Sequence, residues 1–163
     1  GKLEAGSRYN VVPGEANMEG TIRNLDETTR AAIPEFIEQI LEGMKISADI
    51  DYRMEYFKGY PVLNNWKVPA QIAAETVEQV LGKDALAANL EPDLTAEDFG
   101  RYLQVLPGCF CWLGCHEEGT ERFGLHSARF CPDERTLHVG SKLVAGLATN
   151  ALDALSKGVD FTK

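Results

Sequence analysis

The sequence lacks several features that would place it in a familiar class of protein. No apolar run approaches the ~20 residues that a membrane-spanning helix needs, and residues 1–7 lack the apolar stretch of a secretory signal. Basic residues are few, with 16 Lys and Arg against 25 Asp and Glu, for a formal net charge of -9. This balance argues against a nucleic-acid partner, because phosphate contacts need a basic stripe.

Several catalytic motifs are absent as well. The chain has no Gly-x-Ser-x-Gly elbow, no phosphate-binding Gly-rich loop followed by Lys and Ser or Thr, and no Gly-x-Gly-x-x-Gly fingerprint. Cysteines number only 4 in 163 residues, which favours reduced thiols over a disulfide framework. With no membrane segment and no export signal in view, we expect a cytoplasmic protein.

Alternating apolar and polar residues predict three strands in the first part of the chain. Residues 3–12 and 16–23 flank Pro13-Gly14, so they are expected to form a hairpin. The strictest alternation, over residues 46–56, predicts a third strand with one buried and one wet face.

A helix is expected between the hairpin and the third strand. Asp26 is a plausible N-cap, and apolar residues recur at helical spacing from Ile33 to Met44. Pro34 removes a backbone donor, so a kink or a late helix start is expected there. Residues 1–57 thus correspond to three quarters of a ferredoxin-like split β-α-β unit.

The remainder of the chain alternates expected helices and strands. Gly59-Tyr60-Pro61 marks a boundary, which gives a first domain of residues 1–58 and a second of residues 59–163. The second domain is predicted to contain helices at 68–81, 95–104 and from 133 or 134 onward, with strands at 85–90 and 109–113. This pattern favours a layered α/β domain behind an α+β first domain.

His126 lies in an expected loop, and neutral imidazole is the commonest metal ligand in proteins. A metal site needs three or four ligands, however, and this loop supplies one. His116 and His138 are expected to be surface residues. Cys109, Cys111 and Cys115 are poorly spaced for a zinc cluster, so buried thiols are the favoured interpretation.

Four polar residues are further candidates for a site. Glu97 and Asp98 are adjacent acids at an expected helix start, where the helix dipole favours acids whatever the function. Alternatively, they form a carboxylate pair at the mouth of a cleft. Arg23 is either a solvated charge or a clamp for a substrate carboxylate, and the amide of Asn10 would donate to a carbonyl oxygen.

Five blocks of sequence together resemble the metal-dependent amidohydrolases and carboxypeptidases, of the type that includes hippurate hydrolase, indole-acetyl-amino-acid hydrolases and aminobenzoyl-glutamate hydrolase. The blocks are Tyr9-Asn10-Val11-Val12-Pro13 with Met18-Glu19-Gly20-Thr21-Ile22-Arg23, Ala96-Glu97-Asp98-Phe99-Gly100-Arg101-Tyr102, Leu106-Pro107-Gly108 with Trp112-Leu113-Gly114, Leu125-His126-Ser127, and Asp133-Glu134. They follow the order and spacing of that family over nearly the whole chain.

The resemblance implies a two-domain fold, with a catalytic α/β domain and an inserted ferredoxin-like lid that often mediates homodimers. It implies hydrolysis of the amide bond of N-acyl amino acids or related small amides, by water activated on two divalent metal ions such as Zn, Mn or Co. His126 matches the last metal ligand of the family. Arg23 and Asn10 match lid residues near the substrate, and Glu97 and Asp98 match an acidic pair near the site.

The chain also departs from the family. The other metal ligands and the general-base glutamate belong to an N-terminal segment that these 163 residues do not contain. The sequence is therefore interpreted as the C-terminal portion of such an enzyme, inactive without the missing segment. The alternative is a non-catalytic truncated homologue that acts as a dimerisation or binding module through its sheet edge.

Overall fold

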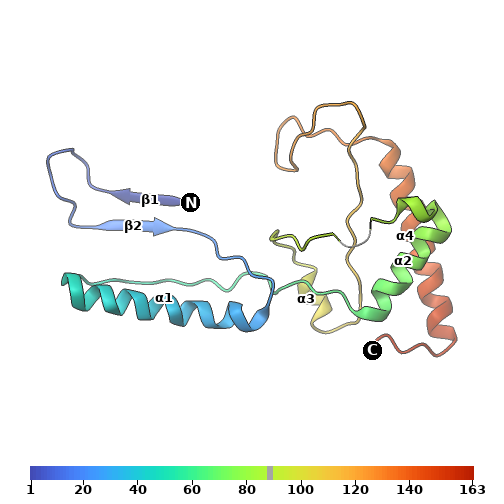
Figure 1. Cartoon of the computed structure of the whole chain (residues 1–163), viewed down its shortest axis with the longest axis horizontal. Coiled ribbons are helices and arrows are strands. Elements are labelled where there is room, and N and C mark those ends of the chain that lie inside the picture. The colour runs from blue at the N-terminus through green and yellow to red at the C-terminus, as the bar shows by residue number, and fades with distance from the viewer. Residues whose placement is uncertain (88–89) are drawn as a thin grey trace. The chain divides into compact units, whose positions relative to one another are not determined.

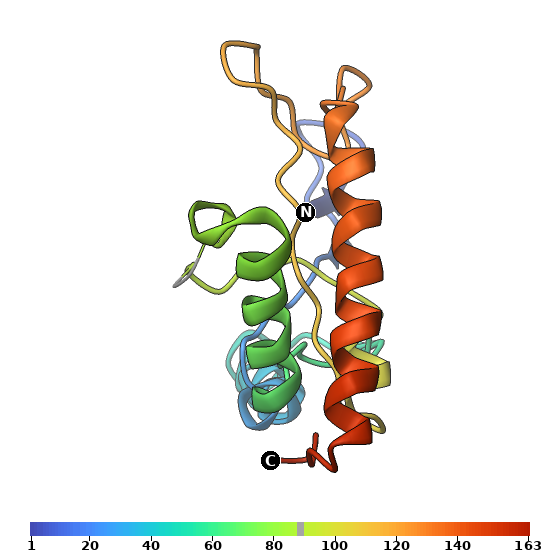
Figure 2. The ribbon, with the colours of Figure 1, turned by 90° about the vertical axis from the view of Figure 1, so that its right-hand side faces the viewer.

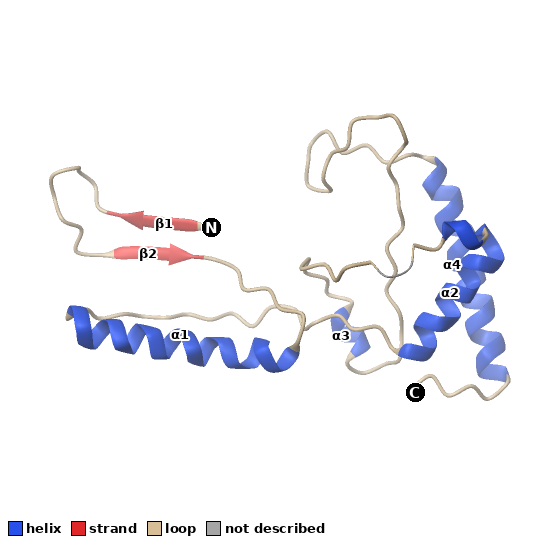
Figure 3. Ribbon diagram, viewed as in Figure 1, coloured by secondary structure: helices blue, strands red, loops and turns tan. Residues whose placement is uncertain are grey.

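In the computed structural model, which describes residues 1–87 and 90–163, the chain divides into two compact units. The first comprises residues 1–62 and 92–96, and the second comprises residues 63–91 and 97–163. Among the described residues, the first unit holds both strands and helix α1, and the second unit holds the other helices, as Figures 1 and 3 show. No helix among the described residues is long and apolar enough to cross a membrane.

The predicted hairpin is confirmed in a shorter form. Strand β1 (Lys2–Ala5) pairs with strand β2 (Ala16–Glu19) in antiparallel register, with Lys2 opposite Glu19 and Ala5 opposite Ala16. The two strands form a two-stranded sheet, so each has one outer edge without a partner strand within the described residues. Leu3 and Met18 are opposite each other and exposed.

Helix α1 (Glu27–Ala48) follows the hairpin and begins where the sequence predicts. Both carboxylate oxygens of Asp26 accept hydrogen bonds from backbone amides, from Thr28 at 2.9 Å and from Thr29 at 2.8 Å. The late start expected from Pro34 is wrong, because the helix passes through this residue. Asp26 accepts hydrogen bonds from amides that would otherwise be unpaired at the first turn of the helix. This cap therefore fixes the start of α1 well before Pro34.

The strand predicted at residues 46–56 is wrong. Helix α1 continues to Ala48 and ends at Asp49, which adopts the left-handed conformation with φ 52°, and the following residues form no strand. Lys45 in the last turn pairs with Asp51 at 2.8 Å, which favours the helical end. A strand also needs a neighbour for its backbone groups, and no other strand lies beside this segment within the described residues.

The segment that returns from α1 is anchored at the start of that helix. Glu27 accepts a hydrogen bond from the amide of Val62 at 2.6 Å and pairs with Arg30 at 3.0 Å, and Arg30 donates to the carbonyl of Gly59. Arg30 is buried. The hydrogen bond from Val62 is the main reason that the pKa of Glu27 is lowered, so the carboxylate is held charged at this junction.

In the second unit, helix α2 (Lys67–Leu81) packs beside helix α4 (Arg135–Ser156), as Figure 2 shows. Both helices were predicted, with Pro69 in the first turn of α2 and Gly82 at its C-cap with φ 96°. The contact is close at Gly146, where a Cβ atom would lie 2.9 Å from Val80 and 3.1 Å from Thr76. Thr76 is fully buried there, and its hydroxyl accepts a hydrogen bond from Asn150 at 2.9 Å.

Three other predictions in this unit need correction. The strand expected at residues 85–90 includes residues 88 and 89, which lie outside the described part, and Ala85 ends the short 3-10 helix η1 (Lys83–Ala85). The helix expected at residues 95–104 is shorter in the structure, where α3 comprises only Gly100–Leu103. Thr95 does not cap it, and the amide of Thr95 donates a hydrogen bond to the carboxylate of Asp93.

The third correction concerns residues 109–113, which form no strand. The backbone of Phe110 bonds to the side chain of Asn65 through both its amide, at 2.8 Å, and its carbonyl, at 2.9 Å. A side-chain amide thus occupies the groups that a neighbouring strand would have bonded.

Candidate functional site

His126 occupies a tight turn within a long loop between residues 115 and 133. The amide of Ser127 donates to the carbonyl of Gly124 at 2.9 Å, which closes the turn around His126. At the base of the loop, the amide of Asp133 donates to the carbonyl of Cys115 at 2.8 Å. The imidazole is therefore presented, exposed, near the middle of a closed loop.

Two ion pairs brace this loop between its base and the histidine. Arg135 contacts Glu117 at 3.5 Å near the base, and Arg129 contacts Glu121 at 3.0 Å nearer the turn. Arg129 also lies over the ring of Phe123, 4.0 Å from its centroid. These contacts are solvent-exposed, so each contributes little alone, but together they limit the conformations of the segment.

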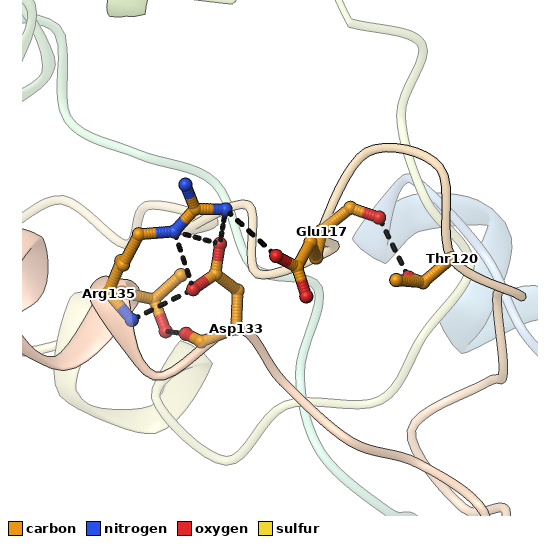
Figure 4. Close-up of polar contacts among 5 residues, drawn as sticks. Glu117, Thr120, Asp133 and Arg135 are labelled. Carbon is orange, nitrogen blue, oxygen red and sulfur yellow. Dashed lines mark hydrogen bonds and ion pairs between the residues drawn. The ribbon is translucent and has the colours of Figure 1, made fainter.

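Asp133 joins the loop to helix α4. Its carboxylate accepts a hydrogen bond from the amide of Arg135 at 2.9 Å and from Nε of the same residue at 2.7 Å, as Figure 4 shows. The side chain of Arg135 is the main cause of a lowered pKa for Asp133. The negative charge at the start of α4 is thus maintained, where the helix dipole also favours it.

Within the described part of the chain, no group of potential metal ligands surrounds His126. Among residues 1–87 and 90–163, no three His, Cys, Asp or Glu side chains converge to hold a metal ion. His116 and His138 are both exposed, as the sequence predicts. The thiols of Cys109 and Cys111 are neighbours without a third ligand among the described residues, and the expected burial of these thiols is wrong for Cys111, which is exposed. The residues present therefore do not by themselves fit a site for two metal ions.

Arg23 and Asn10 lie at opposite ends of strand β2. Asn10 belongs to the exposed loop that joins Ala5 to Ala16, whereas Arg23 lies beyond Glu19, the last residue of the strand. The guanidinium of Arg23 donates to the carbonyl of Leu94 at 2.7 Å. One guanidinium nitrogen of Arg23 is therefore held by a hydrogen bond. The structure does not bring Arg23 and Asn10 together.

Glu97 and Asp98 directly precede α3, and each makes its own local contact. Glu97 is half-buried, and its carboxylate accepts a hydrogen bond from the amide of Phe99 at 3.2 Å. Asp98 is exposed, and its backbone carbonyl accepts from the amide of Arg101 at 2.9 Å. The carboxylate of Glu97 and the backbone of Asp98 thus both contribute to ordering the start of α3.

The sequence did not reveal the residues that brace the loop. Glu117, Glu121, Arg129 and Arg135 are ordinary surface charges by composition, and their pairing depends on the path of the chain. The only local signal was Asp133 at an expected helix start, which is typical of a capping residue.

No family model matches the chain, but individual proteins do. The chain is 32% identical over 154 residues to an N-acetylcysteine deacetylase of Bacillus subtilis, covering 94% of the chain and 39% of that protein. It is 30% identical to an N-acetyldiaminopimelate deacetylase of Brevibacillus brevis and 32% identical to thermostable carboxypeptidase 2 of Saccharolobus solfataricus, covering 89% and 90% of the chain. The chain covers 37% of the length of each of these last two proteins.

A solved structure matches as well. It is a crystal structure of a Bacillus subtilis protein described as a dinuclear metal-binding peptidase of the M20 family. The match has a TM-score of 0.77 and 32% identity, and it covers 94% of this chain and 41% of that one. The chain thus spans about two fifths of the length of the proteins it resembles.

Proposed function

Because the chain is homologous over nearly its whole length to part of the M20 family of metal-dependent deacetylases and carboxypeptidases, we propose that it is the C-terminal portion of an enzyme that hydrolyses the amide bond of N-acyl amino acids. The observation that carries this proposal is the similarity at 32% identity over 154 residues, together with the related fold. Relatives named for N-acetylcysteine and N-acetyldiaminopimelate indicate the class of substrate.

His126 is proposed as the one metal ligand that this chain contributes. Its loop is closed at the base by Cys115 and Asp133 and braced by Arg129 and Arg135, which would hold an imidazole at a constant position. The other ligands of two divalent ions, such as Zn, Mn or Co, would come from residues beyond these 163. The isolated chain is therefore expected to hold no metal tightly and to be inactive.

Arg23 and Asn10 are proposed as substrate contacts at separate points. Nη1 of Arg23 is held by Leu94 at 2.7 Å, and guanidinium carries five N–H donors. The remaining donors suit a carboxylate, as an N-acyl amino acid provides. Glu97 and Asp98 are proposed to lie near the site, where their effect on catalysis would be indirect.

The test of this function is an assay of the protein expressed from the complete reading frame that encodes the chain. We expect it to release the free amino acid from N-acetylcysteine, N-acetyldiaminopimelate or a related N-acyl amino acid. A chelator should abolish the release, and added Zn²⁺, Mn²⁺ or Co²⁺ should restore it. A metal-loaded protein that hydrolyses none of a broad panel of N-acyl amino acids would overturn the proposal.

A second candidate is a homodimerisation module, which we propose would act with or without catalysis. The β1–β2 sheet supports it, because both outer edges are unpaired within the described residues and Leu3 and Met18 are exposed on it. Light scattering on the 163-residue chain should then give the mass of a dimer at micromolar concentration. A monomer at all concentrations would exclude this role. In either case we propose a cytoplasmic location, in keeping with four free cysteines.

A further inference from the structure

Cys109 and Cys111 hold two thiols side by side in the segment after α3. Their sulfur atoms lie 3.5 Å apart, and both residues are free cysteines. Cys111 is exposed, whereas Cys109 is half-buried, with its thiol 3.7 Å from the carbonyl oxygen of Phe110. The pair therefore offers one accessible sulfur with a second sulfur in contact with it.

The backbone between the two thiols is held in place. Asn65 bonds to both the amide and the carbonyl of Phe110, at 2.8 and 2.9 Å, and the amide of Trp66 donates to the carbonyl of Gly108 at 3.0 Å. The ring of Phe110 also contacts Trp112 edge-on, with centroids 5.5 Å apart. Because the intervening residue is fixed, the two sulfur atoms remain near each other and lose little freedom on bonding.

The electrostatics of the pair distinguish its two members. A hydrogen bond from the Cys109 thiol lowers the pKa of Cys111 to about 7. The same contact, followed by burial, raises the pKa of Cys109. At neutral pH a large share of Cys111 is thus thiolate, which is the nucleophilic form of cysteine.

We propose that Cys109 and Cys111 form a redox-active dithiol that closes to an intramolecular disulfide by exchange with a small-molecule disulfide. The Cys111 thiolate attacks one sulfur of the small disulfide, forms a mixed disulfide and releases the other half as a thiolate. Cys109 then loses its proton to solvent and attacks the sulfur of Cys111, which expels the second half. Two protein thiols are oxidised, and one small disulfide is reduced to two thiols.

Little movement is needed for this closure. The two sulfur atoms would approach from 3.5 Å to the ~2.05 Å of a disulfide bond. Rotation of the side chains can provide most of this change while Asn65 retains its hold on Phe110. The site does not involve His126, so it is independent of the proposed hydrolysis.

The test uses the 163-residue chain with Cys115→Ser and Cys131→Ser, which leaves only the two thiols of the pair. It is equilibrated with mixtures of reduced and oxidised glutathione, trapped with iodoacetamide and analysed by mass spectrometry. We expect a species two hydrogens lighter and without bound glutathione. Adding Cys109→Ser should instead leave glutathione attached to Cys111, and adding Cys111→Ser should slow the first reaction at least tenfold at pH 7.

A persistent mixed disulfide when both thiols are present would overturn the proposal, as would a thiol pair that stays reduced in excess oxidised glutathione. In the unsubstituted chain, exposed Cys131 serves as the internal control. Alkylation of Cys131 at the same rate as Cys111 at pH 7 would show that the pair confers no special reactivity. Circular dichroism of each variant excludes loss of fold as the cause of a difference.

Discussion

The backbone amide of Asp133 donates a 2.8 Å hydrogen bond to the carbonyl oxygen of Cys115, so the loop that carries His126 begins and ends at the same point. The loop between them is long, and a free loop of this kind would let the imidazole sample many positions. The closed base of the loop and two ion pairs, Glu117 with Arg135 and Glu121 with Arg129, thus limit the positions open to the His126 imidazole.

Asp133→Ala should loosen this loop. The substitution removes the acceptor for the amide and the guanidinium of Arg135, which join the loop to α4. Hydrogen exchange measured by mass spectrometry should become faster across residues 116–136. The matched control is Glu134→Ala, since the side chain of Glu134 makes no capping bond. Equal exchange in the two variants would contradict the role of Asp133.

Acid should destabilise the first unit partly through Asp26. Hydrogen bonds with Thr29 and Thr28 lower its pKa below the reference value of 3.8. The charged cap therefore contributes its full stability above that value, and the contribution is lost as pH falls through the lowered folded pKa. Asp26→Asn retains an acceptor for the helix start but does not titrate there.

The melting temperature of wild type is thus expected to fall more steeply between pH 5 and pH 2 than that of Asp26→Asn. Asp49→Asn is the control at the other end of α1, where the residue has φ 52° and Asn is well tolerated. It should keep the acid dependence of wild type. If the melting temperatures of Asp26→Asn and wild type fall equally steeply with decreasing pH, then protonation of Asp26 does not contribute to the loss of stability in acid.

Gly146→Ala should destabilise the second unit even though alanine favours helices. The new Cβ would meet Val80 at 2.9 Å and buried Thr76 at 3.1 Å, and overpacking of this kind costs about 1–3 kcal/mol. Gly43→Ala in α1 is the matched substitution in open space, where a gain of about 0.5–1 kcal/mol is expected. Urea unfolding followed by circular dichroism measures both. Stabilisation by Gly146→Ala would mean that α2 and α4 are not in close contact there.

Arg23→Ala should act mainly on the binding of substrates with a free carboxylate. Loss of a charge-assisted contact of roughly 1.5–3 kcal/mol corresponds to a rise in KM of about 10- to 150-fold. Steady-state kinetics on the full-length protein would show this rise with little change in kcat. Comparison with an uncharged amide analogue is the control, because its KM should hardly change. Unchanged KM for the acid would remove Arg23 from the site.

The start of helix α1 and both ends of helix α2 were largely predictable from local signals, whereas two expected strands without a partner strand were not. Asp26 capped α1 as expected, Pro69 lay in the first turn of α2 and Gly82 ended that helix, because these signals act within one turn. The alternation at residues 46–56 and the apolar run at 109–113 indicated strands, but a strand exists only beside another strand. Helix α1 instead continues into the segment 46–56, as far as Ala48, and Asn65 bonds to the backbone of Phe110 in the segment 109–113.

The candidate site shows the same division. The position of His126 in a loop before a helix followed from neighbouring residues. The pairing of Glu117 with Arg135 did not, because the two lie far apart in sequence and any of the surface charges was an equal candidate. The separation of Asn10 from Arg23 also depends on where β2 ends, which its alternation, continuing to Arg23, did not reveal.

In a complete M20-type hydrolase, the proposed role of His126 is to bind one of two metal ions. The direct measurement is metal content per subunit, by mass spectrometry of the purified protein from the complete reading frame, for wild type and His126→Ala. His138→Ala is the control, since that histidine lies exposed on α4. We predict bound divalent metal in wild type and His138→Ala, and a marked loss in His126→Ala together with near-complete loss of turnover. Wild-type metal content and activity in His126→Ala would exclude His126 as a metal ligand.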